Sequence, residues 1–231
     1  MGALKSFQLS ELFFDRGYEV FDDVLPAGDC ATLAQKLKAA MEHDCIPVDN
    51  DGVHIKTRNG EALIAELPEI EQLYQQVYAQ MAAGIANLLV LDDLPVAISA
   101  NYLRRDQGHS FRYHFDRNEY TAVLYLTDSP DLPLCIHPKI RTDPALGESV
   151  WQYERDARVP VRVDPSPGRL VCFHARTSLH GVISSPEVPS TTDRISLQFA
   201  FDTRRRSFED QQYYGRSTAA PAGADVQQDR P

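Results

Sequence analysis

The pattern of apolar and polar residues changes character once along the chain, near residue 96. Before that point, apolar residues recur at helical spacing in two long stretches. The first follows Asp29, a suitable helix N-cap, and repeats at every fourth position as far as Met41. The second runs from about residue 68 to residue 91. Apolar rows of this kind are core faces, so we expect the two helices to cover one side of a sheet.

After residue 96 the chain consists of short runs typical of β-strands, broken by Pro, Gly and Asp, and one earlier run of this type lies at 18–21. The later predicted strands are 96–103, 111–116, 121–127, 133–136, 159–163, 169–173, 180–183 and 194–201. Eight short strands at fairly regular spacing predict a sandwich or barrel, with a jelly roll (double-stranded β-helix) as the favoured form. The predicted fold class is therefore mainly β with N-terminal helices (α+β).

These elements predict a single domain over residues 1–216, with helical support at 22–92 and a jelly-roll core at 96–202. Segment 137–158 interrupts the core as a long irregular insertion, and loops of that length are typical of lids over a binding site. Residues 217–231 are rich in Ala, Pro, Gly, Gln and Asp and carry almost no large apolar side chain, which predicts a disordered tail.

The net charge of −10 over 231 residues indicates a surface that repels phosphates, which argues against a nucleic-acid binder. The one basic run, 204–206, is followed by acidic residues and is expected to be a solvated turn. Four cysteines without C-x-x-C spacing predict free, mostly buried thiols. The N-terminus does not have the pattern of a secretory signal, and no run reaches the roughly 18 apolar residues that span a bilayer. We therefore expect a cytoplasmic protein with no nucleic-acid or membrane partner.

Candidate metal ligands begin with His114 and Asp116 in the stretch FRYHFDRNEY. Residues two apart on a strand place their side chains on one face. One further histidine would complete a facial two-histidine-one-carboxylate set, which suits iron(II) and leaves coordination positions open. His180 is the best candidate, because Gly181 beside it lets backbone or ligand come close. The H-x-D pair alone is a weak signal, since a solvated strand edge would carry the same two side chains.

A second candidate site lies in RISLQFAF, where Arg194 and Ser196 share one face of a predicted strand. The apolar residues that begin at Ile195 alternate with them. If the apolar set packs on the core, Arg194 points into the barrel interior, where an arginine needs an anion. A guanidinium fork with a hydroxyl beside it binds a carboxylate bidentately. The alternative is an edge-strand arginine that pairs with Asp193 or Asp202.

With these residues in view, the sequence resembles the iron(II)- and 2-oxoglutarate-dependent oxygenases, especially the small prolyl-hydroxylase-like members. Their pattern is H-x-D, a distal histidine, and an Arg often followed two residues later by Ser. The resemblance covers roughly residues 16–202 and includes the stretches GYEVFDDVLPAGDCATLAQKL, NYLRRDQGHSFRYHFD and SPGRLVCFHARTSLHGV. Two features depart from the pattern: the spacing from Tyr102 to His114 is longer than usual, and DLPLCI replaces a Gly-Gly near 134–136.

The resemblance implies a dioxygenase that uses Fe(II), 2-oxoglutarate as co-substrate and O2 to oxidise, most simply hydroxylate, a C–H bond of a small molecule such as an amino acid or natural-product intermediate. The carboxylate at the second ligand position excludes halogenation. The site residues that follow are His114, Asp116 and His180 for iron, and Arg194, Ser196 and Tyr102 for 2-oxoglutarate. We expect substrate contacts from Arg112 near the metal strand and from Trp151 and Tyr153 in the insertion.

Three alternatives remain open on the sequence. One is an iron-dependent oxidase that uses the Arg-x-Ser pair for its own substrate's carboxylate, and another is a peptidyl hydroxylase. The third is a jelly-roll binding module whose metal is structural or missing. Arg104, Arg105 and Arg112 near the metal strand would suit a small acidic or amino-acid-like substrate, but the pattern slightly favours a solvated role for them.

Overall fold

The computed structural model describes residues 2–43, 46–50, 53–90, 97–104, 110–142, 159–182 and 193–204. The helices are α1 (Glu11–Arg16), α2 (Ala27–His43), α3 (Gly60–Glu66) and α4 (Glu69–Ala82). The strands are β1 (Tyr18–Phe21), β2 (Ile46–Asn50), β3 (Val53–Asn59), β4 (Leu89–Val90), β5 (Ile98–Leu103), β6 (Ser110–His114), β7 (Tyr120–Tyr125), β8 (Leu134–His137), β9 (Val161–Val163), β10 (Leu170–Phe173), β11 (Leu179–Val182) and β12 (Arg194–Asp202). The predicted fold class, mainly β with N-terminal helices, is confirmed.

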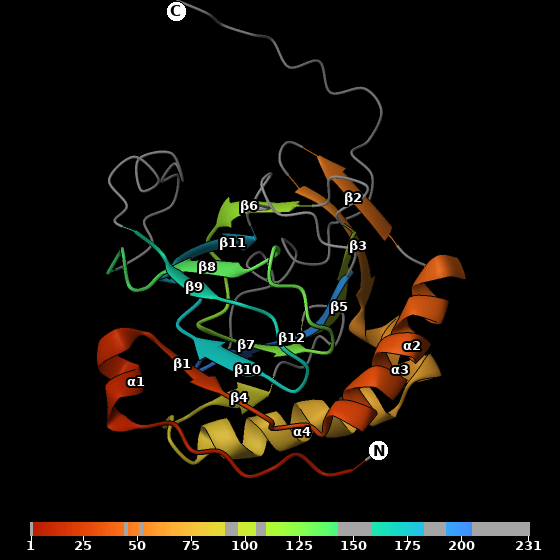
Figure 1. The fold of residues 1–231 in the computed structure, drawn as a ribbon. Helices are drawn as coiled ribbons and strands as arrows, with labels where there is room; N and C mark the ends of the chain where they lie inside the picture. The colour runs from red at the N-terminus through yellow and green to blue at the C-terminus, as the bar shows by residue number, and fades with distance from the viewer. Residues whose placement is uncertain are drawn as a thin grey trace, which may run out of the picture.

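The strands of the described chain form one antiparallel 12-stranded sheet in the order β1-β10-β7-β12-β5-β3-β6-β11-β8-β9, with β2 paired to β3 and β4 to β12. This sheet folds over on itself (Figure 1). Strands β6, β11, β8 and β9 form one layer, β1, β10, β7 and β12 form the opposite layer, and β5 and β3 connect the two at one side. The two layers therefore face each other across the interior of the sheet.

Helix α4 lies on the outer side of the layer that contains β12, and α2 and α3 lie on the outer side of β5 and β3 (Figure 1). They pack through one hydrophobic cluster, in which the apolar rows of α2 and α4 meet alternate residues of β12. The ring of Tyr74 on α4 stacks on Phe201 of β12, with centroids 5.0 Å apart, and its hydroxyl donates to the carbonyl of Ala200 at 3.2 Å. Burial of such large apolar faces is the main stabilising contribution. The prediction that both helices cover one side of the sheet is confirmed.

The β12 strand determines which side chains enter the interior. Its apolar residues, from Ile195 to Phe201 at every second position, belong to the cluster under the helices. Because side chains alternate along a strand, Arg194, Ser196 and Gln198 point to the opposite face, between the two layers. The sequence predicted this orientation from the same alternation.

Two N-terminal elements differ from their predicted form. The second helix ends at Ala82 and not near residue 91. A turn in which Asn87 adopts a positive φ of 60° follows it, and the chain then forms β4 against the end of β12. Residues 46–50 and 53–59, inside the predicted helical support, form the antiparallel pair β2 and β3, and β3 inserts between β5 and β6. Pairing on both sides supplies backbone hydrogen bonds that the local pattern of a polar segment does not reveal.

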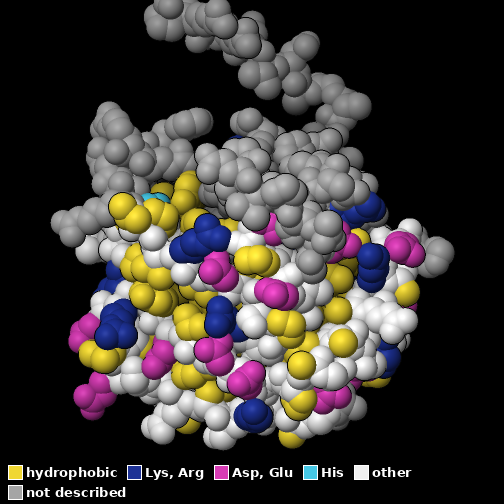
Figure 2. Space-filling model, viewed as in Figure 1, with side chains coloured by type: hydrophobic (Ala, Val, Ile, Leu, Met, Phe, Trp, Pro, Cys, Tyr) yellow, Lys and Arg dark blue, Asp and Glu magenta, His cyan; other side chains and the backbone are white. Residues whose placement is uncertain are grey.

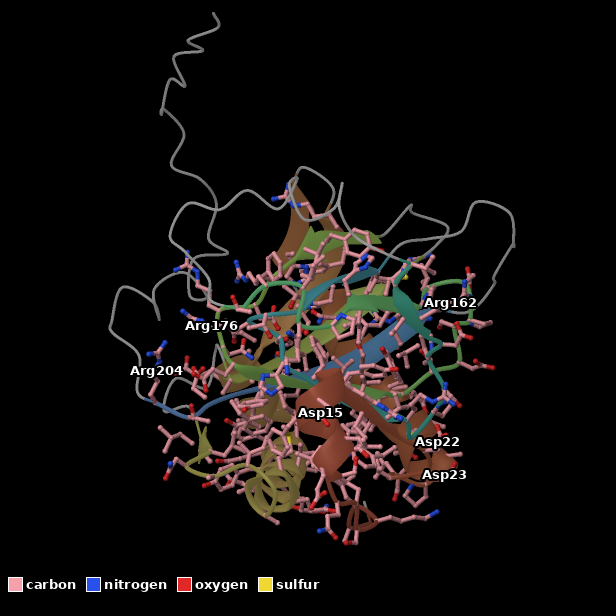
Figure 3. All side chains as sticks on the ribbon, turned by 90° about the vertical axis from the view of Figure 1, so that its left-hand side faces the viewer. Asp15, Asp22, Asp23, Arg162, Arg176 and Arg204 are labelled. Carbon is pink, nitrogen blue, oxygen red and sulfur yellow. The ribbon has the colours of Figure 1, made fainter. Side chains whose placement is uncertain are left out.

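Three further expectations concern the basic run, the cysteines and membrane-spanning helices. On the face shown in Figure 2, basic and acidic side chains are interspersed. Arg204, the first residue of the basic run, is exposed at the periphery (Figure 3) and lies 3.8 Å from Glu119. Cys30, Cys135 and Cys172 are free and buried as predicted, while Cys45 lies outside the described residues. None of the helices in the described ranges is long and apolar enough to cross a membrane.

Candidate active site

The strands β6 and β11 bring two histidines together from distant parts of the sequence. His114 and His180 are direct cross-strand partners, and their ring centroids lie 4.3 Å apart. The Nδ1 of His114 lies 2.9 Å from the carbonyl oxygen of Arg112, and that of His180 lies 2.9 Å from the carbonyl oxygen of Ser178. A ring nitrogen beside a carbonyl carries the proton. Both Nε2 atoms are therefore left with lone pairs that can bind a metal.

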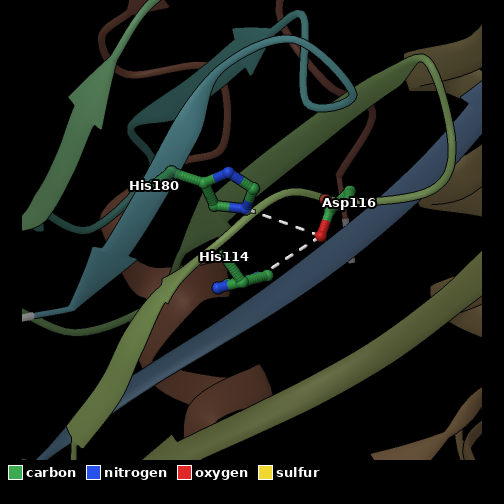
Figure 4. A group of neighbouring side chains, drawn as sticks. All are labelled: His114, Asp116 and His180. Atoms are coloured by element: carbon green, nitrogen blue, oxygen red, sulfur yellow. Dashed lines mark ion pairs between the residues drawn. The ribbon is translucent and has the colours of Figure 1, made fainter. Parts of the chain in front are cut away.

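Asp116 supplies the third group, but not from the strand on which it was predicted. β6 ends at His114, and Asp116 lies just beyond this end, where its N–H donates to the carbonyl of Ala175 at 3.2 Å. Its Oδ1 lies 3.3 Å from Nε2 of His114 and 3.5 Å from Nε2 of His180 (Figure 4). One potential ligand atom from each residue can be chosen so that all three lie within 4.8 Å of one another. Within the described residues this is the one such cluster of His, Cys, Asp or Glu.

The electrostatics of the cluster favour the protonation states that bind metals. Desolvation lowers the pKa of His114, and a positive charge on the neighbouring His180 would lower it further, against the opposing effect of Asp116. Burial alone would raise the pKa of Asp116, but His180 and His114 beside it hold this pKa well below its ordinary value. At neutral pH the site therefore combines an ionised carboxylate with a neutral His114 imidazole. A metal requires ligands in these deprotonated forms.

Gly181 allows β6 and β11 to approach closely next to His180. A Cβ atom at this position would lie 2.8 Å from the carbonyl oxygen of Phe111 and 3.0 Å from the backbone of Arg112. Any other residue would push the two strands apart and separate the histidines. The sequence predicted a close approach at this glycine, and the structure shows that the approaching group is backbone.

Arg194 and Ser196 lie deep in the same interior. Their exposed fractions are 4% and 1%, and β12 runs between β7 and β5, so Arg194 is not on a sheet edge. Neither acidic neighbour pairs with it: Asp193 binds Lys38 at 3.0 Å, and Asp202 accepts the N–H of Glu119 at 2.8 Å. The alternative of an edge arginine paired with these acids is therefore wrong.

Three buried polar atoms around Arg194 have no hydrogen-bond partner within the described chain: its own Nε, Oγ of Ser196 and the hydroxyl of Tyr125. Tyr125 lies on β7 as the cross-strand partner of Ser196, and the guanidinium carbon of Arg194 lies 5.2 Å from its ring centroid. Buried polar groups are almost always hydrogen-bonded, so three together indicate a missing polar ligand. An anion with two or more oxygen atoms would satisfy them.

One pocket joins this group to the histidines. Its lining residues are Asn101, Leu103, Phe111, His114, Val123, Leu134, Phe173, His180, Gly181, Val182, Arg194, Ser196 and Gln198. The pocket therefore has apolar walls, a candidate metal cluster and a buried cation. Such a combination of an apolar cavity with a few convergent polar groups is typical of small-molecule sites.

Other predicted site residues are not brought to this pocket. Tyr102 points to the helix side of β5, where its hydroxyl donates to Oδ2 of Asp193 at 2.7 Å, and Asn101 and Leu103 occupy the pocket face instead. The placement of Tyr102 therefore speaks against its predicted contact with the co-substrate. Arg112 is exposed and does not line the pocket. Trp151 and Tyr153 lie outside the described residues, as do residues 143–158 of the predicted insertion.

Sequence reasoning missed the residues that β7 contributes to the site. Thr121 and Tyr125 lie on the same face of β7 as Val123, which lines the pocket. The alternation of these three with Ala122 and Leu124, which belong to the cluster under the helices, carries the signal. This signal is weak in the sequence because both faces of β7 are buried, so that apolar residues occupy both faces.

Comparison with known proteins places this geometry among solved structures. No protein-family model matches the chain, and no curated protein matches its sequence. A Pseudomonas putida prolyl-4-hydroxylase is 20% identical, with a TM-score of 0.53 over 85% of this chain and 97% of its own. The epimerase SnoN, in complex with Fe3+, alpha ketoglutarate and nogalamycin RO, is 16% identical, with a TM-score of 0.65 over 94% of this chain and 90% of its own.

A third similar structure is HygX from Streptomyces hygroscopicus, with nickel, 2-oxoglutarate and hygromycin B bound. It is 16% identical, with a TM-score of 0.62 over 84% of this chain and 87% of its own. These identities are too low to transfer an activity, but the agreement in fold extends over most of each chain. The predicted resemblance is confirmed at this level: the chain has the fold of the iron- and 2-oxoglutarate-dependent oxygenases, and it carries a His-Asp-His cluster in its interior.

Proposed function

We propose that the protein is an iron(II)- and 2-oxoglutarate-dependent dioxygenase that oxidises a C–H bond of a small molecule, most simply by hydroxylation. The observation that carries the proposal is the coexistence of two incomplete sites in one pocket. The first is the convergence of His114, Asp116 and His180, and the second is the set of partnerless polar atoms around Arg194. The second set would cost free energy if it stayed without a ligand, because its buried polar atoms have no hydrogen-bond partner within the described chain.

The donor set fits iron(II). His114 and His180 would bind it through Nε2, and Asp116 would bind it through Oδ1, which faces both rings. Two imidazoles and one carboxylate on one side of a metal are the ligands of non-haem iron(II) oxygenases and leave open positions. The hydrogen bonds from both Nδ1 atoms to backbone carbonyls orient the rings for this role.

The buried polar group fits the far carboxylate of 2-oxoglutarate. Arg194 would bind it with a planar fork, and the hydroxyls of Ser196 and Tyr125 would each donate one hydrogen bond. When bound, iron would supply the chemistry in which O2 oxidises 2-oxoglutarate to succinate and carbon dioxide and leaves an oxidant for a substrate C–H bond. The chain itself orients these groups, and walls such as Phe111 and Phe173 exclude water from them.

The proposal includes the architecture that supports the site. We infer that the folded-over sheet is a double-stranded β-helix and that residues 1–216 form one domain, since one cluster of buried residues runs from α2 and α4 to β12. A small-molecule substrate is supported by two similar structures, HygX and SnoN, whose complexes contain hygromycin B and nogalamycin RO. A peptidyl substrate is the alternative, because other similar structures are prolyl hydroxylases.

The closest rival is an iron-dependent oxidase in which Arg194 and Ser196 bind the substrate's own carboxylate. The test starts with binding, since this needs no known substrate: the apoprotein is titrated anaerobically with Fe(II) and then with 2-oxoglutarate. We expect a weak visible charge-transfer absorbance that requires both, and its absence in His180→Ala. Oxygen uptake and succinate release are then measured across a metabolite screen. Oxygen consumption that does not require 2-oxoglutarate would favour the rival, and failure to bind iron at all would favour a binding module.

A further inference from the structure

The two oxygens of Asp116 have different surroundings. Oδ1 faces Nε2 of both histidines, whereas Oδ2 points away from them and accepts a 2.6 Å hydrogen bond from the hydroxyl of Thr121. The side-chain amide of Gln198 lies 3.5 Å from the same Oδ2. Thr121 is fully buried, with an exposed fraction of 0%. Water therefore does not compete for this bond.

Thr121 is itself oriented by a second buried residue. The side-chain amide of Asn118 donates to the Thr121 hydroxyl at 2.8 Å and to the carbonyl of Tyr120 at 2.6 Å. Because the threonine oxygen accepts a bond from Asn118, its single proton is left for Asp116. The polar chain thus runs in one direction, from Asn118 through Thr121 to Asp116.

The strand that carries Thr121 holds it firmly in place. On one side of β7, Thr121 is the cross-strand partner of Phe173 on β10, and on the other side it is the partner of Ala200 on β12. Asp116, in contrast, lies in the segment after β6 and has no strand pairing of its own. The hydrogen bond therefore ties a side chain on an irregular segment to the centre of the sheet.

We infer that Thr121 is a positioning residue of the proposed metal site, which limits Asp116 to one metal-binding oxygen. The inference rests on the proposed function. A carboxylate can bind a metal through one oxygen or both. With Oδ2 held by Thr121, Asp116 offers Oδ1 alone, so the protein supplies three ligand atoms and an octahedral ion keeps three positions for other ligands. If Oδ2 were free to turn towards the ion, the carboxylate could occupy a fourth position.

The alternative is that Thr121 only satisfies a buried acceptor. Two variants separate these roles. Thr121→Val keeps the shape of the side chain but removes the hydroxyl, and Thr121→Ser keeps the hydroxyl. Thr127→Val is the matched control. It removes the hydroxyl of a threonine just after β7, which donates to the carbonyl of Asp193 at 2.7 Å and not to a residue of the metal cluster.

The affinity of each purified apoprotein for Mn(II) is measured from the electron paramagnetic resonance signal of the free ion. A thermal melt of every variant checks that it is folded. Removal of groups that orient metal ligands typically weakens metal binding 10–100-fold. We expect a loss of about that size for Thr121→Val, an affinity within about threefold of wild type for Thr121→Ser, and an unchanged affinity for Thr127→Val.

The outcomes distinguish this inference from the proposed function. If the wild type binds Mn(II) and a folded Thr121→Val variant binds it equally well, the positioning role is wrong while the metal site stands. If the wild type binds no Mn(II), both fail. If Thr121→Val does not fold, Thr121→Ala is judged by the same affinity criterion. A second readout is the visible spectrum of the Co(II) protein, which we expect to change in Thr121→Val and not in Thr121→Ser.

Discussion

His114 on β6 and His180 on β11 are direct cross-strand partners, and both direct Nε2 at the same oxygen of Asp116. Their positions are determined by backbone pairing rather than by contacts between the rings. The two rings and the carboxylate are therefore held in place before any ligand binds. The site is thus preorganised for a metal ion.

Replacing any of the three residues should remove metal binding without unfolding the protein. We expect His114→Ala, Asp116→Ala and His180→Ala to lose measurable Fe(II) binding and turnover, with melting temperatures close to that of the metal-free wild type. His137→Ala is the control, since His137 is a buried histidine on β8 outside the cluster. Metal titration, turnover assays and thermal melts check this. Full activity in one of the three variants would remove that residue from the metal site.

Arg194 should determine the affinity for 2-oxoglutarate. Loss of one partner of a buried charge pair costs about 3–5 kcal/mol, or roughly two to four orders of magnitude in binding. Arg194→Ala should therefore bind 2-oxoglutarate that much more weakly, while iron binding survives. Arg194→Lys should be intermediate, because it keeps the charge and loses the fork. Ser196→Ala and Tyr125→Phe should each cost on the order of 1 kcal/mol.

These affinities are measured by titrating 2-oxoglutarate into the Fe(II) protein without oxygen. Arg162→Ala provides the control, because Arg162 is an exposed arginine on β9 that pairs with Asp164. If Arg194→Ala keeps its 2-oxoglutarate affinity but loses affinity for the substrate, the pair belongs to the substrate and the rival oxidase is correct.

Protonation of His114 should weaken metal binding on acidification, but only below the ordinary histidine pKa. His114 binds a metal as the neutral imidazole, and desolvation holds its pKa below 6.5. The neutral form is therefore already dominant at pH 6.5, and affinity falls only as the pH drops through the lowered pKa. Mn(II) titrations from pH 8 to pH 5 check this. A loss of affinity centred above pH 6.5 would show that a different group controls binding.

A buried carboxylate that is not part of the metal cluster should make stability depend on pH. Burial raises the pKa of Asp202 to about 7. The hydrogen bond from the backbone N–H of Glu119 lowers this pKa, whereas the negative charge of the Glu119 side chain raises it. Between its ordinary value of 3.8 and about 7, the native state holds a proton that the unfolded state releases, so stability falls as the pH rises.

Asp202→Asn should remove this fall. As the pH rises from 5 to 8, the free energy of unfolding of the wild type should fall by on the order of 2 kcal/mol more than that of the variant. Urea denaturation at several pH values measures it. Asp15→Asn, a change at an exposed acid on α1 (Figure 3), is the control and should follow the wild type. Parallel curves for Asp202→Asn and the wild type would contradict the raised pKa.

Much of the core was readable from the sequence because short strands bounded by Pro, Gly and Asp leave strong local signals. Strand β1 falls on the predicted 18–21, and alternation along β12 correctly oriented Arg194 and Ser196. The distal histidine was found through the glycine beside it, whose close backbone contact is a sterically demanding feature.

Other features depend on packing that no local pattern reveals. The resemblance implies a co-substrate contact for Tyr102, yet Tyr102 shares the buried face of β5 with Ile98 and Ala100, the face that packs with the helices, while Ser99 and Asn101 on the other face are only half-buried. The hydroxyl of Tyr102 instead binds Asp193 on the helix side. Likewise, β3 is a strand because β5 and β6 pair with it, and Tyr125 gains its role only because β7 places it beside Ser196.

The most direct test of the central claim is a crystal structure of the protein with Mn(II) and 2-oxoglutarate, grown without oxygen, with the metal located by its anomalous signal. We predict one ion bonded to Nε2 of His114, Oδ1 of Asp116 and Nε2 of His180. The far carboxylate of 2-oxoglutarate should contact Arg194, with Tyr125 and Ser196 donating to it. An ion elsewhere, an ion without Asp116 as a ligand, or a 2-oxoglutarate molecule that does not reach Arg194 would contradict the account.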